Sequence, residues 1–138
     1  MNNKEEILSE IKKSGFPEKE VAISIYDFFA NENYSENCIG VNVYPDPPKP
    51  EKFYEVFSQL ISNGKAERIL VRISDIDDPK EWLFSDAVYV ISKLEFEELK
   101  SCVISLSPTE IYEDFMYGKP ENISAIDTGL RIYSIWWD

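Results

Sequence analysis

Apolar residues at helical spacing predict the clearest helix of the chain, over residues 50–62. These residues recur at intervals of three and four, as they do on the buried face of an amphipathic helix. They are Phe53, Val56, Phe57, Leu60 and Ile61. Pro50 suits the first turn, where its missing amide would have no helical partner, and Asn63-Gly64 ends the helix.

Two further helices are predicted, one on either side of this helix. Ser92 and Glu95 form a capping-box pattern before a helix that Pro108 stops. Its predicted buried face is Phe96, Leu99, Val103 and Leu106. Near the N-terminus, Asn3 can cap a helix that ends at Gly15. Its shared apolar face is Ile7, Leu8 and Ile11.

Apolar residues with a period of two predict strands elsewhere. The clear cases are residues 38–44, 68–74, 87–92 and 130–137. The last segment has a bulky apolar residue on both faces, so we expect both faces to be covered. Its own chain would cover them, unless one tryptophan belongs to an interface with a partner.

Two segments leave the choice between strand and helix open. Residues 21–29 alternate as a strand would, but a helix begun at Pro17 fits nearly as well. Residues 109–117 favour a strand over a further turn of helix.

The order of elements from Cys38 onward is strand, helix, strand, strand, helix, strand. This order predicts an α+β fold of the ferredoxin-like type, a split β-α-β sandwich with a mainly antiparallel sheet. An N-terminal helix and strand and a C-terminal strand would be additions to it. Residues 1–138 carry no linker or repeat, so we expect one domain. Two helices on one sheet face leave the other to be covered by the additions, a ligand or another subunit.

Charge narrows the classes of partner. The chain has 26 acidic against 14 basic residues, a formal net charge of −12. Such a charge disfavours binding to nucleic acid or to a membrane surface, and would attract a basic protein. It would also simply keep the protein soluble.

The two cysteines and the N-terminus indicate an intracellular protein. Cys38 and Cys102 lie far apart and are expected to be reduced. Residues 1–6 are polar and show no secretory leader, so we expect a cytoplasmic location.

Several common catalytic motifs are missing from the sequence. The chain contains no histidine, which removes Ser-His-Asp and Cys-His nucleophiles and His-ligated zinc. The five glycines are isolated, so no phosphate-binding loop or dinucleotide motif exists. We therefore expect no cofactor and lean against an enzyme, although lysine, carboxylate or metal-assisted mechanisms stay open. Cys38 has no neighbouring base in sequence to activate it as a nucleophile.

Two acidic groups are the candidate sites. The first, in the loop over residues 75–81, is Asp75, Asp77, Asp78 and Glu81. It could hold Mg²⁺ or Ca²⁺, but it lacks EF-hand spacing and is more typical of a solvated turn, so no metal is expected. The second is Glu110, Glu113 and Asp114, which could be an acid–base pair, an acidic interface or plain surface. Candidate interface aromatics are Tyr112, Tyr117 and Trp137.

Several short stretches resemble a group of small, acidic bacterial proteins of unassigned function. The stretches are Asp27–Phe29, Ile39–Asn42, Phe84–Tyr89 and Tyr133–Asp138. The resemblance implies a bacterial source and assigns no catalytic residue.

These observations favour a non-enzymatic protein-binding module of the immunity or inhibitor type, acting on a basic partner. The alternatives are a small-molecule-binding or carboxylate-based enzymatic domain, and a homo-oligomeric structural protein.

Overall fold

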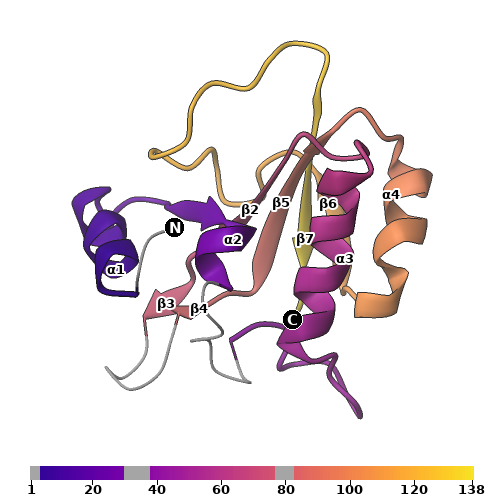
Figure 1. Cartoon of the computed structure of the whole chain (residues 1–138), viewed down its shortest axis with the longest axis horizontal. Helices are drawn as coiled ribbons and strands as arrows, with labels where there is room; N and C mark the ends of the chain where they lie inside the picture. Colours follow the sequence, from indigo (N-terminus) through magenta and orange to yellow (C-terminus); the bar gives the residue numbers. More distant parts are fainter. Residues whose placement is uncertain (1–3, 30–37, 77–82) are drawn as a thin grey trace.

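A five-stranded antiparallel sheet forms the centre of the structure (Figure 1). The computed structural model describes residues 4–29, 38–76 and 83–138. The strands in spatial order are β1 (Ala22–Ser24), β2 (Arg68–Arg72), β5 (Ala87–Ser92), β7 (Arg131–Trp136) and β6 (Glu110–Glu113). A separate two-stranded ribbon pairs β3 (Asp75–Ile76) with β4 (Leu83–Phe84).

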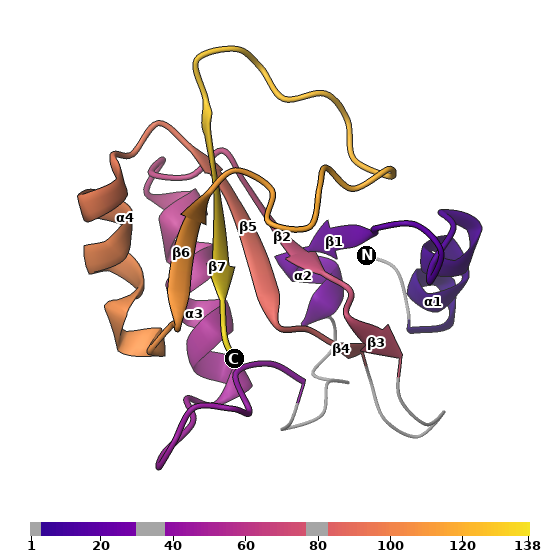
Figure 2. The same cartoon turned by 180° about the vertical axis from the view of Figure 1, so that it is seen from behind.

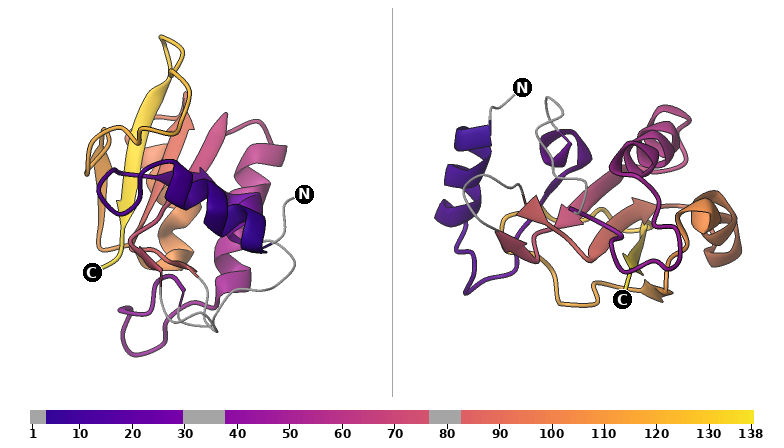
Figure 3. Two further views of the ribbon diagram at one scale, coloured as in Figure 1. Left: turned by 90° about the vertical axis from the view of Figure 1, so that its left-hand side faces the viewer. Right: turned by 90° about the horizontal axis from the view of Figure 1, so that it is seen from below.

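The helices lie on one side of this sheet and beyond its β1 end (Figure 3). They are α1 (Lys4–Lys13), α2 (Ile25–Phe28), α3 (Pro50–Ser62) and α4 (Phe96–Val103), the last continued by the 3₁₀ turn η2 (Ile104–Leu106). Among the described residues, no helix has the length and apolar character needed to cross a membrane.

The main core lies between the sheet and the helices. All six residues of β5 are buried, and β7 contributes Tyr133 and Ile135 to the helix side. Trp137 follows β7 and is 1% exposed. Its ring lies 5.1 Å from that of Phe53 on α3, and its indole N–H donates to the Leu106 carbonyl at 2.9 Å. Trp137 is therefore a core residue, and its prediction as an interface aromatic is wrong.

The opposite face of the sheet is covered by the long connection between β6 and β7 (Figure 2). From this connection Phe115, Ile123, Ile126 and Leu130 pack on Leu70, Tyr89, Ile91 and Ile132. The expectation that β7 is covered on both sides is confirmed, and the chain itself supplies both covers. The sheet face that could have needed a ligand or a second subunit is thus occupied.

The predicted helices agree closely with the structure. In α3 the buried residues include Phe53, Phe57 and Leu60, and Pro50 stands in the first turn. In α1, Ile7 and Ile11 are buried, while Asn3 lies outside the described residues.

The capping box of α4 begins at a different residue from the predicted one. The observed cap is Glu95, with Glu98 as its partner three residues later. The sequence had predicted Ser92 as the cap and Glu95 as the partner. The Ser92 hydroxyl instead accepts the Leu94 amide and donates to the Lys65 carbonyl, which fixes the turn before the helix.

The segment over residues 21–29 contains both of the predicted alternatives. Three residues form β1, and the chain then turns into α2 at Ser24. The Ser24 hydroxyl accepts the Asp27 amide at 3.1 Å, which is the usual N-cap contact. The preference for strand over residues 109–117 is confirmed for β6 only, because Asp114 ends it at a φ of 131°.

The strand predicted over residues 38–44 is wrong. Only Ile39 makes an isolated bridge, to Ser85, and the Val43 amide then turns back to the Gly40 carbonyl at 3.2 Å. Gly40 has a φ of 69°, which breaks an extended chain, and it lies directly against the ring of Phe53.

The ferredoxin-like arrangement is not confirmed, although the α+β class and the antiparallel sheet are. A split β-α-β unit needs a parallel pair of strands joined across a helix. Without a strand at residues 38–44 that pair cannot form, and every pairing of the five described strands is antiparallel.

Gly40→Ala tests this packing, with Gly64→Ala as a matched control. Both glycines have positive φ, at 69° and 74°, but only at Gly40 would an added Cβ collide with a ring. We expect Gly64→Ala to cost about 1–2 kcal/mol of unfolding free energy from backbone strain alone. Gly40→Ala should cost about 1–3 kcal/mol more, from overpacking against Phe53. Urea unfolding measures both, and equal losses would contradict this packing.

Candidate functional site

One edge of the sheet, at β1, is closed by a side chain. The Ile73 amide donates to the Val21 carbonyl at 2.9 Å. Because residues of an antiparallel strand alternate in the direction of their backbone groups, the N–H and C=O of the next residue, Ala22, point away from β2. Both groups are taken by Asn122, whose amide donates to the Ala22 carbonyl at 2.6 Å and accepts its N–H at 3.1 Å. Asn122 thus imitates a neighbouring strand. The Glu121 amide, which donates to the Glu20 carbonyl at 3.0 Å, extends the cover.

The other edge, at β6, has no such cover among the described residues. β6 pairs with β7 alone. The Asp114 amide donates to the Ile132 carbonyl at 2.9 Å, so alternate residues of β6 direct their backbone groups away from β7. These residues are Ile111 and Glu113.

Carboxylates surround this open edge. Glu110, Glu113 and Asp114 are all exposed, and Tyr112 between them is 46% exposed. The Asp114 carboxylate accepts the neighbouring Phe115 amide at 2.7 Å. We call Glu110, Tyr112, Glu113 and Asp114 the acidic edge. The structure therefore brings together the second acidic group predicted from the sequence and one of its three aromatics.

A groove runs beside the acidic edge on the α4 side. It has a volume of about 310 Å³ and is lined by Phe96, Lys100, Ile104, Ser107, Pro108, Thr109, Glu110 and Ile111. Ile104 is 65% exposed, which is unusual for an isoleucine beside a core. Arg131 on β7 lies beside Glu113 and pairs with Glu95 at 3.3 Å.

The remaining predicted site residues lie elsewhere. Asp75 opens β3, where its own carboxylate accepts the Ile76 amide at 2.8 Å. Asp77, Asp78 and Glu81 lie outside the described residues. No group of three or more metal-ligating side chains occurs among the residues that the structure describes.

Tyr117, which is 37% exposed, belongs to a partly buried charge cluster that the sequence did not reveal. Its ring lies 3.6 Å from the guanidinium carbon of Arg72, and its hydroxyl donates to Asp86 at 3.3 Å. Arg72 makes a bidentate contact with Glu20, at 2.6 and 3.1 Å, and bonds Asp86 at 3.1 Å and Ser74 at 3.0 Å. Three acceptors from separate segments thus hold this arginine, which fastens β2 to the chain before β1 and to the start of β5.

Electrostatics agree with a structural role for Arg72. Burial alone would lower the pKa of its guanidinium, but the hydrogen bond and charge of Glu20 and the charge of Asp86 outweigh burial and raise it. Nearby, burial raises the pKa of the Tyr89 phenol, which has no hydrogen-bond partner among the described groups. The sequence gives no local signal of this cluster, because Glu20 and Asp86 lie 52 and 14 residues from Arg72.

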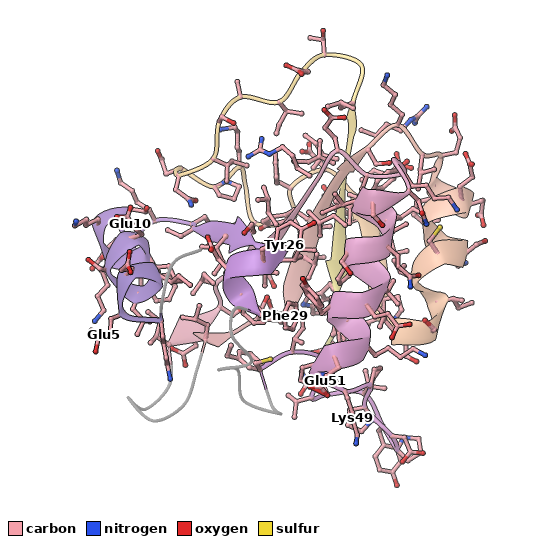
Figure 4. All side chains as sticks on the ribbon, viewed as in Figure 1. Glu5, Glu10, Tyr26, Phe29, Lys49 and Glu51 are labelled. Atoms are coloured by element: carbon pink, nitrogen blue, oxygen red, sulfur yellow. The ribbon has the colours of Figure 1, made fainter. Side chains whose placement is uncertain are left out.

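A larger groove lies at the opposite end of the molecule, between α1, β1 and residues 122–124. Its volume is about 840 Å³, and its lining mixes carboxylates with cations. The charged residues are Glu5, Glu6, Glu10, Asp27, Lys13 and Arg68. Glu5 and Glu10 stand on α1, remote from α4 (Figure 4). Burial raises the pKa of the Asp27 carboxyl.

An exposed aromatic pair joins α2 to α3 and was also missed by sequence reasoning. Tyr26 and Tyr54 are 45% and 38% exposed, and their rings meet edge to face at 6.3 Å. The ring of Phe29, which is labelled together with Tyr26 in Figure 4, lies 5.6 Å from the Tyr54 ring. They sit on two different helices, so no single sequence pattern predicts them.

The thiols can be checked by alkylation. Burial raises the pKa of Cys38 to about 12, and the side chain is 1% exposed, so a thiolate hardly forms at neutral pH. We expect iodoacetamide at pH 8 to modify half-buried Cys102 and to spare Cys38 until urea unfolds the chain. Fast modification of Cys38 in the folded protein, read by mass spectrometry, would reopen its role as a nucleophile.

Comparison with known proteins gives one match. No curated protein and no solved structure matches the chain significantly. The family model described as the uncharacterized protein YfbO family matches residues 2–135. Since this match spans nearly the whole sequence, the chain belongs to the YfbO family.

Proposed function

We propose that the protein is a non-catalytic binding module, of the inhibitor or immunity type, that docks a basic protein on its acidic edge. The observation that carries the proposal is the placement of Glu110, Glu113 and Asp114 around the open edge of β6. Carboxylates gathered at this edge favour a partner with lysines or arginines and disfavour an acidic one. The adjoining groove offers an apolar contact that charge alone would not provide.

The charge of the whole chain favours the same partner. A net charge of −12 would draw a basic protein toward the surface before contact, which raises the association rate above that of neutral partners.

An acid–base pair at this edge is disfavoured by the geometry of a strand. Glu110 and Glu113 are three positions apart in β6, so their side chains leave opposite faces of the sheet. Register agrees, since Glu110 pairs with Trp136 and Glu113 with Tyr133, whose ring lies in the helix-side core. Two carboxylates on opposite faces cannot flank one bond of a substrate.

A second candidate function is favoured by the groove at α1. Its mixed lining, with Glu5, Glu10 and Asp27 against Lys13 and Arg68, would suit a small polar ligand with both charges. A ligand bound there would leave the acidic edge untouched, because α1 and β6 lie at opposite ends of the molecule (Figure 2).

Charge reversal tests the proposal. We expect tagged wild type to retain a basic protein from a bacterial lysate at low salt, and the double variant Glu110→Lys/Glu113→Lys to lose it. The matched control is Glu5→Lys/Glu10→Lys, which changes net charge equally but lies on α1. With the captured protein purified, the association rate should fall about ten-fold or more between low and high salt, because screening removes the steering.

Equal capture by wild type and by the edge variant would contradict the proposal. So would an association rate that does not respond to salt. Loss of capture in both charge-reversed variants would mean that net charge, and not the acidic edge, selects the partner.

A further inference from the structure

We propose that the partner is bound by strand addition: an extended segment with alternating basic and apolar residues pairs with the backbone of Ile111 and Glu113. The inference rests on the proposed function and names the form of recognition at the same edge. Strand addition uses main-chain hydrogen bonds for affinity and alternate side chains for specificity.

The backbone supplies the first argument. Both edges of the five-stranded sheet carry backbone N–H and C=O groups that point away from the sheet. These groups belong to Ala22 on β1 and to Ile111 and Glu113 on β6. At β1 the outward groups are satisfied by the Asn122 side chain. At β6 nothing comparable is present among the described residues, so this edge is the one available to an incoming strand.

The side chains beside the edge define the sequence that would fit. A strand added to β6 sends alternate side chains to the two faces of the sheet. On the α4 side they meet Glu113 and the groove between Phe96, Ile104 and Ile111, whose volume of about 310 Å³ suits an aliphatic side chain. On the other side they meet Glu110 and the exposed Tyr112, which suit a lysine or arginine.

A second copy of this chain fits the edge poorly. In a two-fold antiparallel pairing, directly opposite residues share a sheet face, and the outward backbone groups of Ile111 and Glu113 must meet those of the other copy. A pairing centred on Tyr112 places Glu110 of one copy opposite Asp114 of the other at both ends, and a pairing centred on Glu113 places this carboxylate opposite itself. A pairing centred on Ile111 places Glu110 opposite Tyr112. Like charges directly opposite each other destabilise a strand pair. The acidic edge therefore discourages self-association and selects a basic strand.

Synthetic peptides test the inference without knowledge of the natural partner. The probe is a fluorescently labelled eight-residue peptide in which lysine and valine alternate, with blocked ends. A peptide of the same composition with four lysines followed by four valines keeps the charge and loses the alternation. We expect the alternating peptide to saturate in fluorescence anisotropy and to bind about ten-fold or more tightly than the block peptide.

N-methylation then separates backbone pairing from charge. In antiparallel addition the valines facing α4 also pair with Ile111, so N-methyl groups on valine should abolish binding and those on lysine should not. In parallel addition the lysines make the backbone hydrogen bonds, so N-methyl groups on lysine should abolish binding and those on valine should not. Either outcome supports strand addition.

Other outcomes overturn it. Binding that is insensitive to both N-methyl sets, or equal for alternating and block peptides, would leave charge-based docking at the edge and remove strand addition. Strand addition would also be ruled out if the alternating peptide showed no saturable binding up to about 1 mM. If Glu110→Lys/Glu113→Lys leaves binding of both peptides unchanged, the acidic edge is not the site and the proposed function itself fails.

Discussion

The rest of the structure depends on the burial of β5 and β7 on both faces. All six residues of β5 are buried, and β7 adds Tyr133 and Ile135 on one face and Ile132 on the other. Burial of apolar surface is the largest stabilising term in folding, so each face needs a cover of its own. Helices α3 and α4 cover one face, and the connection from β6 to β7 covers the other.

That connection also decides which edge of the sheet is free. On its way across the second face it carries Asn122 to Ala22 and closes the β1 edge. It leaves β6 at Asp114, whose φ of 131° bends the chain off the sheet, so it does not return to cover β6 from outside. Among the residues that the structure describes, both faces and one edge of the sheet are occupied, and β6 is where backbone groups and carboxylates stay available. An exposed edge strand is an aggregation hazard, and the carboxylates here restrict what can pair with it.

Local pattern predicted the elements whose stability is local, and missed what depends on distant contacts. The helix at Phe53 and Phe57 was predicted with its buried face, because its period is set within a few turns. The strand at 38–44 was wrong because Gly40 turns the chain beneath the Phe53 ring, which alternation does not reveal. The residues of the acidic edge were predicted as a group, because they lie close together in the sequence. That they border an uncovered strand was not predicted, because this depends on the order of strands in the sheet. The Asn122 and Arg72 contacts join segments 100 and 52 residues apart and left no sequence signal.

Residue-resolved amide hydrogen exchange of the free protein tests the central claim, one closed and one open edge, most directly. The account predicts strong protection of the Ala22 amide, which is bonded to Asn122. It predicts that the amides of Ile111 and Glu113 exchange about ten-fold or more faster than that of Tyr112, which faces β7. Protection of Ile111 and Glu113 equal to that of Tyr112 would mean that the β6 edge is already covered, and would contradict the account.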